Sequence, residues 1–440
     1  MQKRTENDAA EVFRMRRYVS LLIAVLFITA GLCSCGKRES QKQPVPDDGE
    51  KQSVSDGNTQ SDSKTDFVCD LFIGDGFLTE KYALYHCQNG GALHLFDTTE
   101  KTDVVFCFDP GCEHKPAVTS LKGDIIKEGC PSYAFGESTV MLQGDKCYFL
   151  TDNGDLILAD RQGENRKKIG SLPPYVLLPS LAVFSDDALY VVYHNSYEMI
   201  EKQNDDGSTQ WIIGDVMDQT VTGIFRMNLS DGSCSEIFHA KDYNSRIPTV
   251  DIRGEHLYFE YFCLDIPFVG PDLETYGPSG QIPEGLTVEN YWDEMPKHQW
   301  IDVYDYHMTT GELNSVLSHR PCKEMVFCNG FFALSEGETT ALYRYNGEKF
   351  RTLDFPISSG YRSDSGLICI NAKEAAVYLL IDENTGEVIK RVNVPYGTFN
   401  PRVFIGTACY GLVNGSGIGY LSAEDFWNGQ YQNATVFPEE

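Results

Sequence analysis

Residues 144–170 read GDKCYFLTDNGDLILADRQGENRKKIG and decide the fold. Two short apolar segments, 147–150 and 155–159, flank the polar turn 151–154. Residues 160–163 form a second turn, and a third segment follows it. Short apolar runs separated by Gly, Asp and Asn are typical of antiparallel strands joined by tight hairpins. The stretch therefore predicts a β-meander.

The same pattern recurs from residue 67 to the end of the chain. Aromatic-rich strands alternate strictly with strands that end in polar hairpins. The aromatic-rich strands are expected at residues 82–85, 147–149, 189–192, 257–259, 331–334, 367–370 and 409–412. We interpret each pair as strands two and three of a four-stranded propeller blade, which typically takes roughly 40–50 residues. The sequence therefore predicts an all-β, seven-bladed β-propeller over residues 67–440, with six or eight blades as alternatives.

Some intervals between successive aromatic strands are too long for one blade. The extra residues fall at 108–134, 194–219 and 263–299. Because every strand of an antiparallel meander reverses the chain, topology places these insertions on one face. Binding sites favour loops that a rigid scaffold holds. We expect a ligand site on this face; the alternative is a set of independent surface loops.

Aromatic residues in the second and third insertions, and one directly after the third, are the candidates for ligand binding. Stacking aromatics on Pro- and Gly-rich loops suit sugar rings or peptide side chains. The alternative is that these rings pin the loops to the propeller. The candidate residues are Trp211, Tyr276, Tyr291, Trp292 and Trp300.

A cluster of metal-ligand residues lies in and around the first insertion. Cys107, Cys112, His114 and Cys130 occur in the segments FCFDPGCEHKP and EGCPSY. Three thiols and one imidazole form a complete tetrahedral ligand set for zinc, which would be structural because no position stays open. The spacing differs from that of standard zinc fingers. A disulfide, favoured in oxidising surroundings, and unpaired buried thiols stay open as alternatives.

The first residues have the organisation of an export signal. Basic residues up to Arg17 precede an apolar run at 19–32 that is too short to span a bilayer comfortably. The sequence Leu-Cys-Ser-Cys that ends at Cys35 resembles a bacterial lipobox. That resemblance implies a signal peptide at 1–34, cleavage before Cys35 and acylation of its sulfur. Cys33 departs from the usual pattern, and an uncleaved anchor helix is the alternative.

Residues 35–66 separate this signal from the predicted propeller. They consist mainly of Ser, Gln, Lys, Asp, Gly and Pro and contain almost no apolar residue. Such a segment cannot bury a core, so we expect the lipidated Cys35 to be followed by a disordered linker. The predicted location is the cell membrane, with the body lipid-anchored on the extracytoplasmic side.

The charge of the chain bears on its partners. It carries 36 basic and 64 acidic residues, for a net charge of −28. Nucleic-acid binding needs a basic footprint, so this charge argues against it. The charge also disfavours contact with anionic lipid, which leaves the acyl anchor as the expected membrane contact.

The lipobox, the polar tether, the Cys/Cys-x-His/Cys cluster and the repeated hairpins resemble, in combination, a set of exported lipoproteins of Gram-positive bacteria with WD40-like or TolB-like propellers. This resemblance covers most of the chain. It implies an anchored propeller and no particular activity.

The sequence contains no Gly-x-Ser-x-Gly elbow, no His-Glu-x-x-His motif and no P-loop. We therefore expect a binding module for a glycan, peptide or protein partner on the loop-rich face. One alternative is a carbohydrate-active or other hydrolase whose acid pair comes from different blades. A second alternative is a scaffold for an envelope complex.

Overall fold

The computed structural model describes residues 77–437 with gaps, and the longest gap is 267–289. All described residues belong to Ser63–Glu440, one of the two units into which the chain divides. The predicted signal peptide at 1–34, the lipidation site Cys35 and the linker to residue 66 lie outside the described residues. Within the described ranges, no helix is long and apolar enough to cross a membrane.

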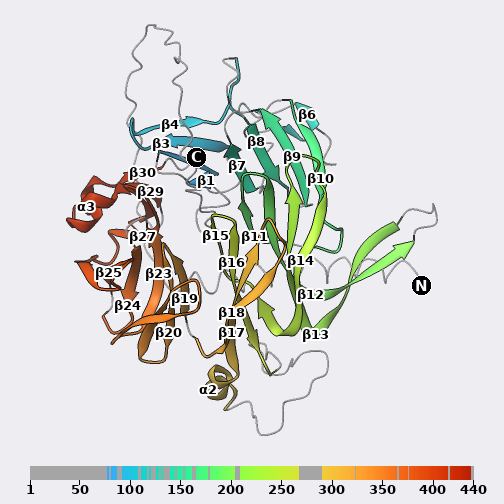
Figure 1. The fold of residues 1–440 in the computed structure, drawn as a ribbon. Helices are drawn as coiled ribbons and strands as arrows, with labels where there is room; N and C mark the ends of the chain where they lie inside the picture. Colours follow the sequence, from blue (N-terminus) through green and yellow to red (C-terminus); the bar gives the residue numbers. More distant parts are fainter. Residues whose placement is uncertain are drawn as a thin grey trace, which may run out of the picture. The chain divides into compact units, whose positions relative to one another are not determined.

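The first two sheets are antiparallel meanders of four strands each (Figure 1). Their strands are β1 (Phe77–Leu78), β2 (Tyr82–His86), β3 (Leu93–Asp97) and β4 (Thr102–Val105), then β7 (Thr139–Gln143), β8 (Lys146–Leu150), β9 (Asp155–Asp160) and β10 (Lys167–Ser171). Residues 144–170 supply β8, β9 and most of β10.

The next sheet has eight strands. They are β11 (Pro179–Phe184), β12 (Ala188–Gln203), β13 (Thr209–Asn228), β14 (Cys234–Arg246), β15 (Val250–Arg253), β16 (His256–Leu264), β17 (Gln299–His307) and β18 (Leu313–Arg320). Strand β14 pairs with β13 through most of its length and then with β16, where Arg246 lies opposite Phe262. Strand β15 pairs with the first half of the same edge of β16. The sheet thus contains two meanders joined through β14.

The last three sheets are again four-stranded meanders. Their strands are β19 (Glu324–Cys328), β20 (Phe331–Glu336), β21 (Thr339–Tyr343) and β22 (Lys349–Leu353), then β23 (Ile357–Ser363), β24 (Gly366–Asn371), β25 (Val377–Asp382) and β26 (Val388–Asn393), then β27 (Phe399–Ile405), β28 (Ala408–Val413), β29 (Gly417–Ser422) and β30 (Thr435–Val436). A short helix, α3 (Ala423–Trp427), and the 3-10 helix η5 (Tyr431–Asn433) connect β29 to β30.

The predicted aromatic-rich strands are the second strands of the meanders, from β2 to β28. In β24, Leu367 and Cys369 pack toward β19–β22, whereas Ile368 packs toward β27–β30. A strand buried on both faces needs apolar residues at nearly every position, which explains why these segments read as continuous apolar runs. The all-β propeller fold is confirmed. A count of seven blades, which divides the eight-stranded sheet into two, stays a prediction.

Hydrophobic clusters join each meander to the next, and the final cluster joins the last meander to the first. It contains Tyr85 and Phe96 from β2 and β3 together with Tyr410 from β28 and Phe437 beyond β30. Figure 1 shows the red β27–β30 strands beside the blue β1–β4 strands. The first and last meanders belong to separate sheets, so packing of their side chains closes the propeller.

One hairpin glycine is required by the packing of neighbouring meanders. Gly232, in the turn between β13 and β14, has a φ of +70°, in the region that L side chains rarely adopt. A Cβ at this position would collide with the backbone carbonyl of Ile169 in β10. The turn and the edge strand β10 can therefore touch only where residue 232 has no side chain.

The described parts of the insertions differ from plain loops. The predicted insertion at 194–219 is an extension of β12 and β13, which pair as far as Gln203 and Thr209. The insertion at 108–134 contains the paired strands β5 (Val118–Thr119) and β6 (Ile125–Lys127). The insertion at 263–299 contains α2 (Tyr291–Glu294) and the 3-10 helix η4 (Met295–Lys297). Their common placement on one face stays a prediction.

Candidate metal centre and ligand cavities

The structure brings the four predicted metal-ligand residues together. Cys107 follows β4, Cys112 and His114 lie in the segment after it, and Cys130 lies before β7. The ligand atoms of these four residues all lie within 4.8 Å of one another. The cluster therefore has the spacing of a metal site, as the sequence predicted.

Backbone contacts hold the two halves of this cluster together. The amide of Cys130 donates a 2.8 Å hydrogen bond to the carbonyl of Lys115, next to His114. The Sγ of Cys130 lies 3.6 Å from Nδ1 of His114. A tetrahedral zinc with sulfur at about 2.3 Å and nitrogen at about 2.0 Å separates such ligands by about 3.5 Å. The cysteine and histidine therefore already have the separation that a shared ion requires.

The protonation of Cys130 also suits a ligand. Burial on its own would raise the pKa of this thiol, but hydrogen bonds with Ser132, His114 and Cys112 outweigh burial and lower the pKa to about 7. The hydroxyl of Ser132 lies 2.8 Å from the sulfur. Metals bind the thiolate, so a thiol that ionises near neutral pH costs little to deprotonate. No disulfide joins any of the ten cysteines in the described part of the chain, including the three in the cluster.

The predicted ligand-binding aromatics have different positions. Trp211 lies in β13, where its backbone pairs with Glu201, and Tyr291 and Trp292 lie in α2. Tyr276 is outside the described residues. Trp300, in β17, is half-buried and packs against the cluster between β11–β14 and β15–β18, with its ring 4.5 Å from that of His319. Trp300 thus packs between strands of the propeller, and both ligand binding by the set and the alternative that the rings pin the loops stay predictions.

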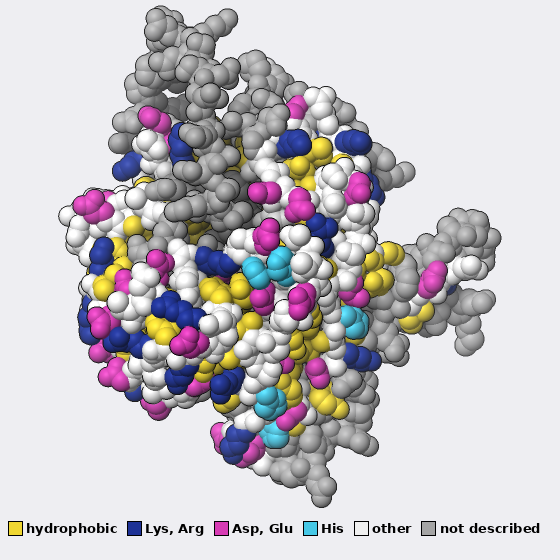
Figure 2. Space-filling model, viewed as in Figure 1, with side chains coloured by type: hydrophobic (Ala, Val, Ile, Leu, Met, Phe, Trp, Pro, Cys, Tyr) yellow, Lys and Arg dark blue, Asp and Glu magenta, His cyan; other side chains and the backbone are white. Residues whose placement is uncertain are grey.

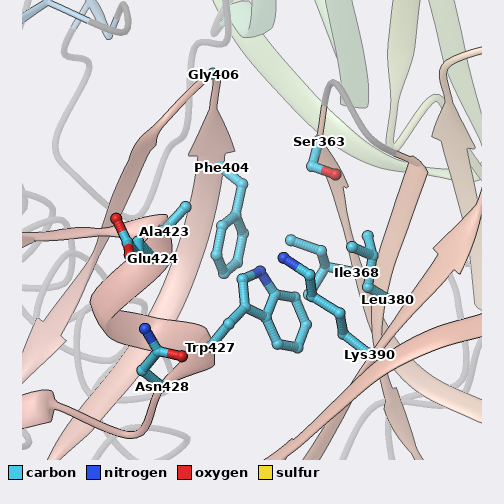
Figure 3. Close-up of a pocket in the computed structure, with 10 residues that line it drawn as sticks. All are labelled: Ser363, Ile368, Leu380, Lys390, Phe404, Gly406, Ala423, Glu424, Trp427 and Asn428. Carbon is cyan, nitrogen blue, oxygen red and sulfur yellow. The ribbon is translucent and has the colours of Figure 1, made fainter.

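A cavity of about 380 Å³ lies between β23–β26 and β27–β30. Trp427, the last residue of α3, lines it, and Figure 3 shows its indole between Lys390 and Phe404. The amine of Lys390 in β26 lies 5.8 Å from the centre of the Trp427 ring, and Phe404 in β27 lies beside the same ring with centroids 6.5 Å apart. Glu424 and Asn428 also line the cavity. The arrangement combines an aromatic face with a cation, an anion and an amide.

Local sequence explains why Trp427 is half-exposed there. Ser422 caps α3, because its hydroxyl accepts a 3.0 Å hydrogen bond from the amide of Asp425. Phe426 is fully buried and fixes the helix to the core. The helix ends before Gly429, whose φ is +71°. With Phe426 directed into the core, the next residue is left at the rim of the cavity.

A second cavity, of about 240 Å³, lies between β16 and β19. Glu260 and Glu324, from these two strands, both line it. Burial raises the pKa of Glu260 to about 8, and the nearby charge of Glu324 adds to this shift while Arg246 opposes it. Burial also raises the pKa of Glu324 to about 7. Two carboxyl groups from separate meanders therefore share one partly dehydrated space.

Neither cavity was predicted from the sequence. One signal was present for the second: β16 reads HLYFEYFCL, in which Glu260 stands at an inward position of an otherwise apolar run. The Trp427 cavity had no comparable signal, because its residues come from two meanders and a helical turn. On the visible face, Figure 2 shows acidic side chains scattered and interleaved with basic ones.

The chain was compared with known proteins. No protein-family model and no curated protein matches it. Among solved structures, BamB from Moraxella catarrhalis is 11% identical, with a TM-score of 0.36 over 77% of this chain and 81% of that chain. Dipeptidyl peptidase 4 from Porphyromonas gingivalis is 10% identical, with a TM-score of 0.45 over 78% of this chain and 57% of that chain. A chain of the mitotic checkpoint complex is 8% identical, with a TM-score of 0.44 over 88% and 99% of the two chains. Similarities at this level carry no argument about function.

Proposed function

We propose that this protein is a binding module: a β-propeller, lipid-anchored outside the cell membrane, that holds a glycan, peptide or protein partner. The observation that carries the proposal is the Trp427 cavity in Figure 3. Aromatic faces bind the apolar faces of sugars and side chains, and a few placed polar groups then fix the orientation of the ligand. Lys390, Glu424 and Asn428 supply such groups around the indole.

The rigidity of the surroundings supports binding at this place. The cavity walls belong to two meanders whose side chains share one hydrophobic cluster with the buried Phe426. A site on such elements is formed before the ligand arrives, so little conformational entropy is lost when the ligand binds. The predicted site at Trp211, Tyr276, Tyr291, Trp292 and Trp300 is retained as a second surface to be tested.

Anchoring rests on the sequence. The basic and apolar segments before Cys35 have the order of an export signal, and the polar linker after it would hold the body away from lipid. Incorporation of a palmitate analogue into the protein, and its loss in a Cys35→Ser variant, tests this part. Unlabelled wild-type protein in an expressing bacterial strain would contradict it.

The cluster of Cys107, Cys112, His114 and Cys130 supports a structural zinc. The donor set is that of closed zinc sites, and a bound ion would cross-link the segment after β4 to the residue before β7. With four protein ligands, the ion would have no open position for water. Its role would be to stabilise the insertion between the first two meanders.

A glycan and peptide array, probed with the full chain in mild detergent with and without a chelator, tests the binding function. We expect selective binding that a Trp427→Ala variant loses and a Tyr396→Ala variant retains. Tyr396 is the matched control because its side chain is 98% exposed. Absence of any selective binding by folded wild-type protein would contradict the proposal.

A hydrolase on the same scaffold is the less favoured alternative, and the pair Glu260 and Glu324 is the observation that favours it. Two carboxyl groups with separate pKa values can act as acid and base. Turnover of an array component, abolished by Glu324→Gln, would support this alternative. A scaffold for an envelope complex would instead show stable capture of a protein partner without turnover.

A further inference from the structure

Glu260 occupies a position that the strand pattern reserves for apolar side chains. Successive residues of a strand face opposite sides, and its neighbours at i−2 and i+2, Tyr258 and Phe262, pack into the cluster shared with β19–β22. Glu260 therefore faces the same interface. The residue is only 7% exposed.

The cavity beside Glu260 lies where the edge of β16 changes its pairing partner. The edge of β16 is paired by β15 as far as Phe259, opposite Val250, and by the end of β14 from Phe262 onward, opposite Arg246. Between these ladders the amide of Glu260 donates a 3.1 Å hydrogen bond to the carbonyl of Thr249. The edge changes partner at Glu260, at the place where this residue lines the cavity.

The carboxyl group of Glu260 has no partner of its own. Among the described residues, no hydrogen bond or ion pair reaches it, although it lines the cavity. A carboxyl group in a partly dehydrated cavity is unfavourable without a hydrogen bond, and in native structures protein groups, ordered water or ligands satisfy nearly all such groups. A carboxyl group that receives no hydrogen bond from the protein and faces a cavity therefore points to a ligand that supplies donors.

Other groups around the cavity indicate the kind of donor. Glu324 contributes a second carboxyl group, and Gln299 contributes an amide whose nitrogen already donates to the carbonyl of Cys322 at 2.7 Å. The guanidinium of Arg246 lies over the ring of Phe262, 4.6 Å from its centroid. The chain thus places one of its own guanidinium groups on an aromatic face beside two acids.

We propose that this cavity binds the guanidinium or ammonium group of a basic side chain on a peptide or protein partner. The inference rests on the proposed binding function and names a ligand class for a second site. A cation would pair with the carboxyl groups of Glu260 and Glu324 and lie against Phe262, whose ring face attracts cations. The net charge of −28 favours approach of a basic partner.

Arg246 acts as the internal competitor for this site. Its residue is exposed and its guanidinium has no hydrogen bond or ion pair among the described residues, so it can leave the ring at low cost. Removal of Arg246 should open Phe262 and leave the acidic pair without a nearby cation. An Arg246→Ala variant is therefore expected to bind basic ligands more tightly.

The raised pKa values of the pair support the geometry. With pKa values of about 8 and about 7, the two groups hold protons near neutral pH when the cavity is empty. Cysteine Cys322, whose own pKa burial raises, also borders the cavity and does not supply a negative charge there. A bound cation stabilises the carboxylates and expels protons, so binding should strengthen as the pH rises from 6 to 9.

Isothermal titration calorimetry on the full chain in detergent tests the inference. The probes are blocked tripeptides with arginine, lysine or citrulline at the centre, together with free putrescine and CaCl₂. We expect the arginine and lysine peptides to bind and the neutral citrulline peptide to bind at least tenfold more weakly. Heats measured in buffers of different ionisation enthalpy should show proton release.

Three variants complete the design. Glu260→Gln should weaken binding of the basic peptides at least tenfold, Arg246→Ala should strengthen it several-fold, and Glu312→Gln should leave it unchanged. Glu312 is an exposed carboxyl residue between β17 and β18 of the same sheet. Because Arg246 is exposed, its variant reports on the site independently of any change at the buried Glu260.

Several results would overturn the inference. One is a citrulline peptide that binds as tightly as the arginine and lysine peptides, and another is an Arg246→Ala variant that binds basic peptides more weakly than the wild type. The others are binding of calcium in place of the peptides, and binding of putrescine as tight as that of the peptides. Hydrolysis of a probe would assign the pair to catalysis instead. Array binding to neutral glycans with no basic-peptide binding would defeat this inference and leave the binding module intact. Binding of basic peptides with no binding to neutral glycans would support this site and count against the Trp427 cavity.

Discussion

The phenol ring of Tyr85 in β2 stacks on the phenyl ring of Phe437, with centroids 4.6 Å apart and planes inclined by 26°. The two residues stand near opposite ends of the described chain. Phe437 also contacts Phe96 at 4.6 Å, and its amide donates to the carbonyl of Ile418. A residue beyond the last strand therefore supplies part of the cluster that joins the first meander to the last.

Replacement of Phe437 by alanine should weaken this closure. Phe437 is 3% exposed, and deletion of a buried phenylalanine ring typically costs about 3–5 kcal/mol. Relaxation near the chain end reduces this, so we expect a loss of about 2–4 kcal/mol in the free energy of unfolding, measured in urea. The control is Val436→Ala, since Val436 is 47% exposed and should cost less than about 0.5 kcal/mol. Equal effects of the two variants would show that the ring contact does not hold the ends together.

Much of the fold could be predicted because each meander repeats the same local chemistry. Strand β24 and its equivalents are buried on both faces, so their apolar character is continuous and easy to recognise. The metal cluster could be predicted because Cys107, Cys112 and His114 are close in the chain and only Cys130 is distant. In both cases the information lies within short segments.

The cavities could not be predicted because they arise between segments. Glu260 and Glu324 meet only when β16 and β19 pack, and they line the cavity together with residues from β14 and β17. Strand extension was missed for a different reason. The segment after Asn195 is polar enough to read as a loop, yet its backbone groups are satisfied by pairing β12 with β13.

Gly232→Ala should destabilise the contact between neighbouring meanders. Alanine would be strained at a φ of +70° and its Cβ would meet the carbonyl of Ile169 in β10. We expect a loss of about 2 kcal/mol or more in the free energy of unfolding, from urea denaturation. Gly254→Ala is the matched control, because Gly254 has a φ of +56° but open space at its Cβ position. That variant should lose only about 1 kcal/mol in the free energy of unfolding, which is the cost of placing an L residue at a positive φ. Equal losses of stability in the two variants would show that the contact with Ile169 does not exclude a side chain at residue 232.

Zinc should copurify with the protein and stabilise it. We expect one zinc ion per chain by elemental analysis, and we expect a chelator to lower the melting temperature, because an ion that binds only the folded state adds to its stability. Cys130→Ser should lose the metal, since it removes the buried ligand of the cluster. Cys234→Ser is the control, because Cys234 is a free cysteine in β14, outside the cluster. Full zinc occupancy in Cys130→Ser, or a melting temperature that the chelator does not change, would contradict a zinc site at this cluster.

The buried acid in the second cavity should give stability a defined dependence on pH. The pKa of Glu260 is about 8 in the folded protein and near its ordinary value of 4.5 in the unfolded chain. The folded state therefore binds more protons between these values, and its stability is complete below pH 4.5 and falls as the pH rises through 8. One such group contributes a slope of up to about 1.4 kcal/mol per pH unit. Glu324, whose pKa is also raised, adds a fall of the same sign, and the charge of Arg246 reduces the shift of Glu260.

Glu260→Gln isolates the contribution of this residue, because glutamine has the same shape and never ionises. The variant should match the wild type near pH 4.5 and exceed it by about 1–3 kcal/mol at pH 8.5, since the variant no longer has to ionise a buried group. Urea denaturation at intervals of half a pH unit measures the two profiles. Glu312→Gln, at an exposed position, should keep the wild-type profile. Parallel profiles for Glu260→Gln and the wild type would mean that Glu260 is solvated or paired in the folded protein, and the cavity would then lose the unsatisfied acid on which its proposed ligand depends.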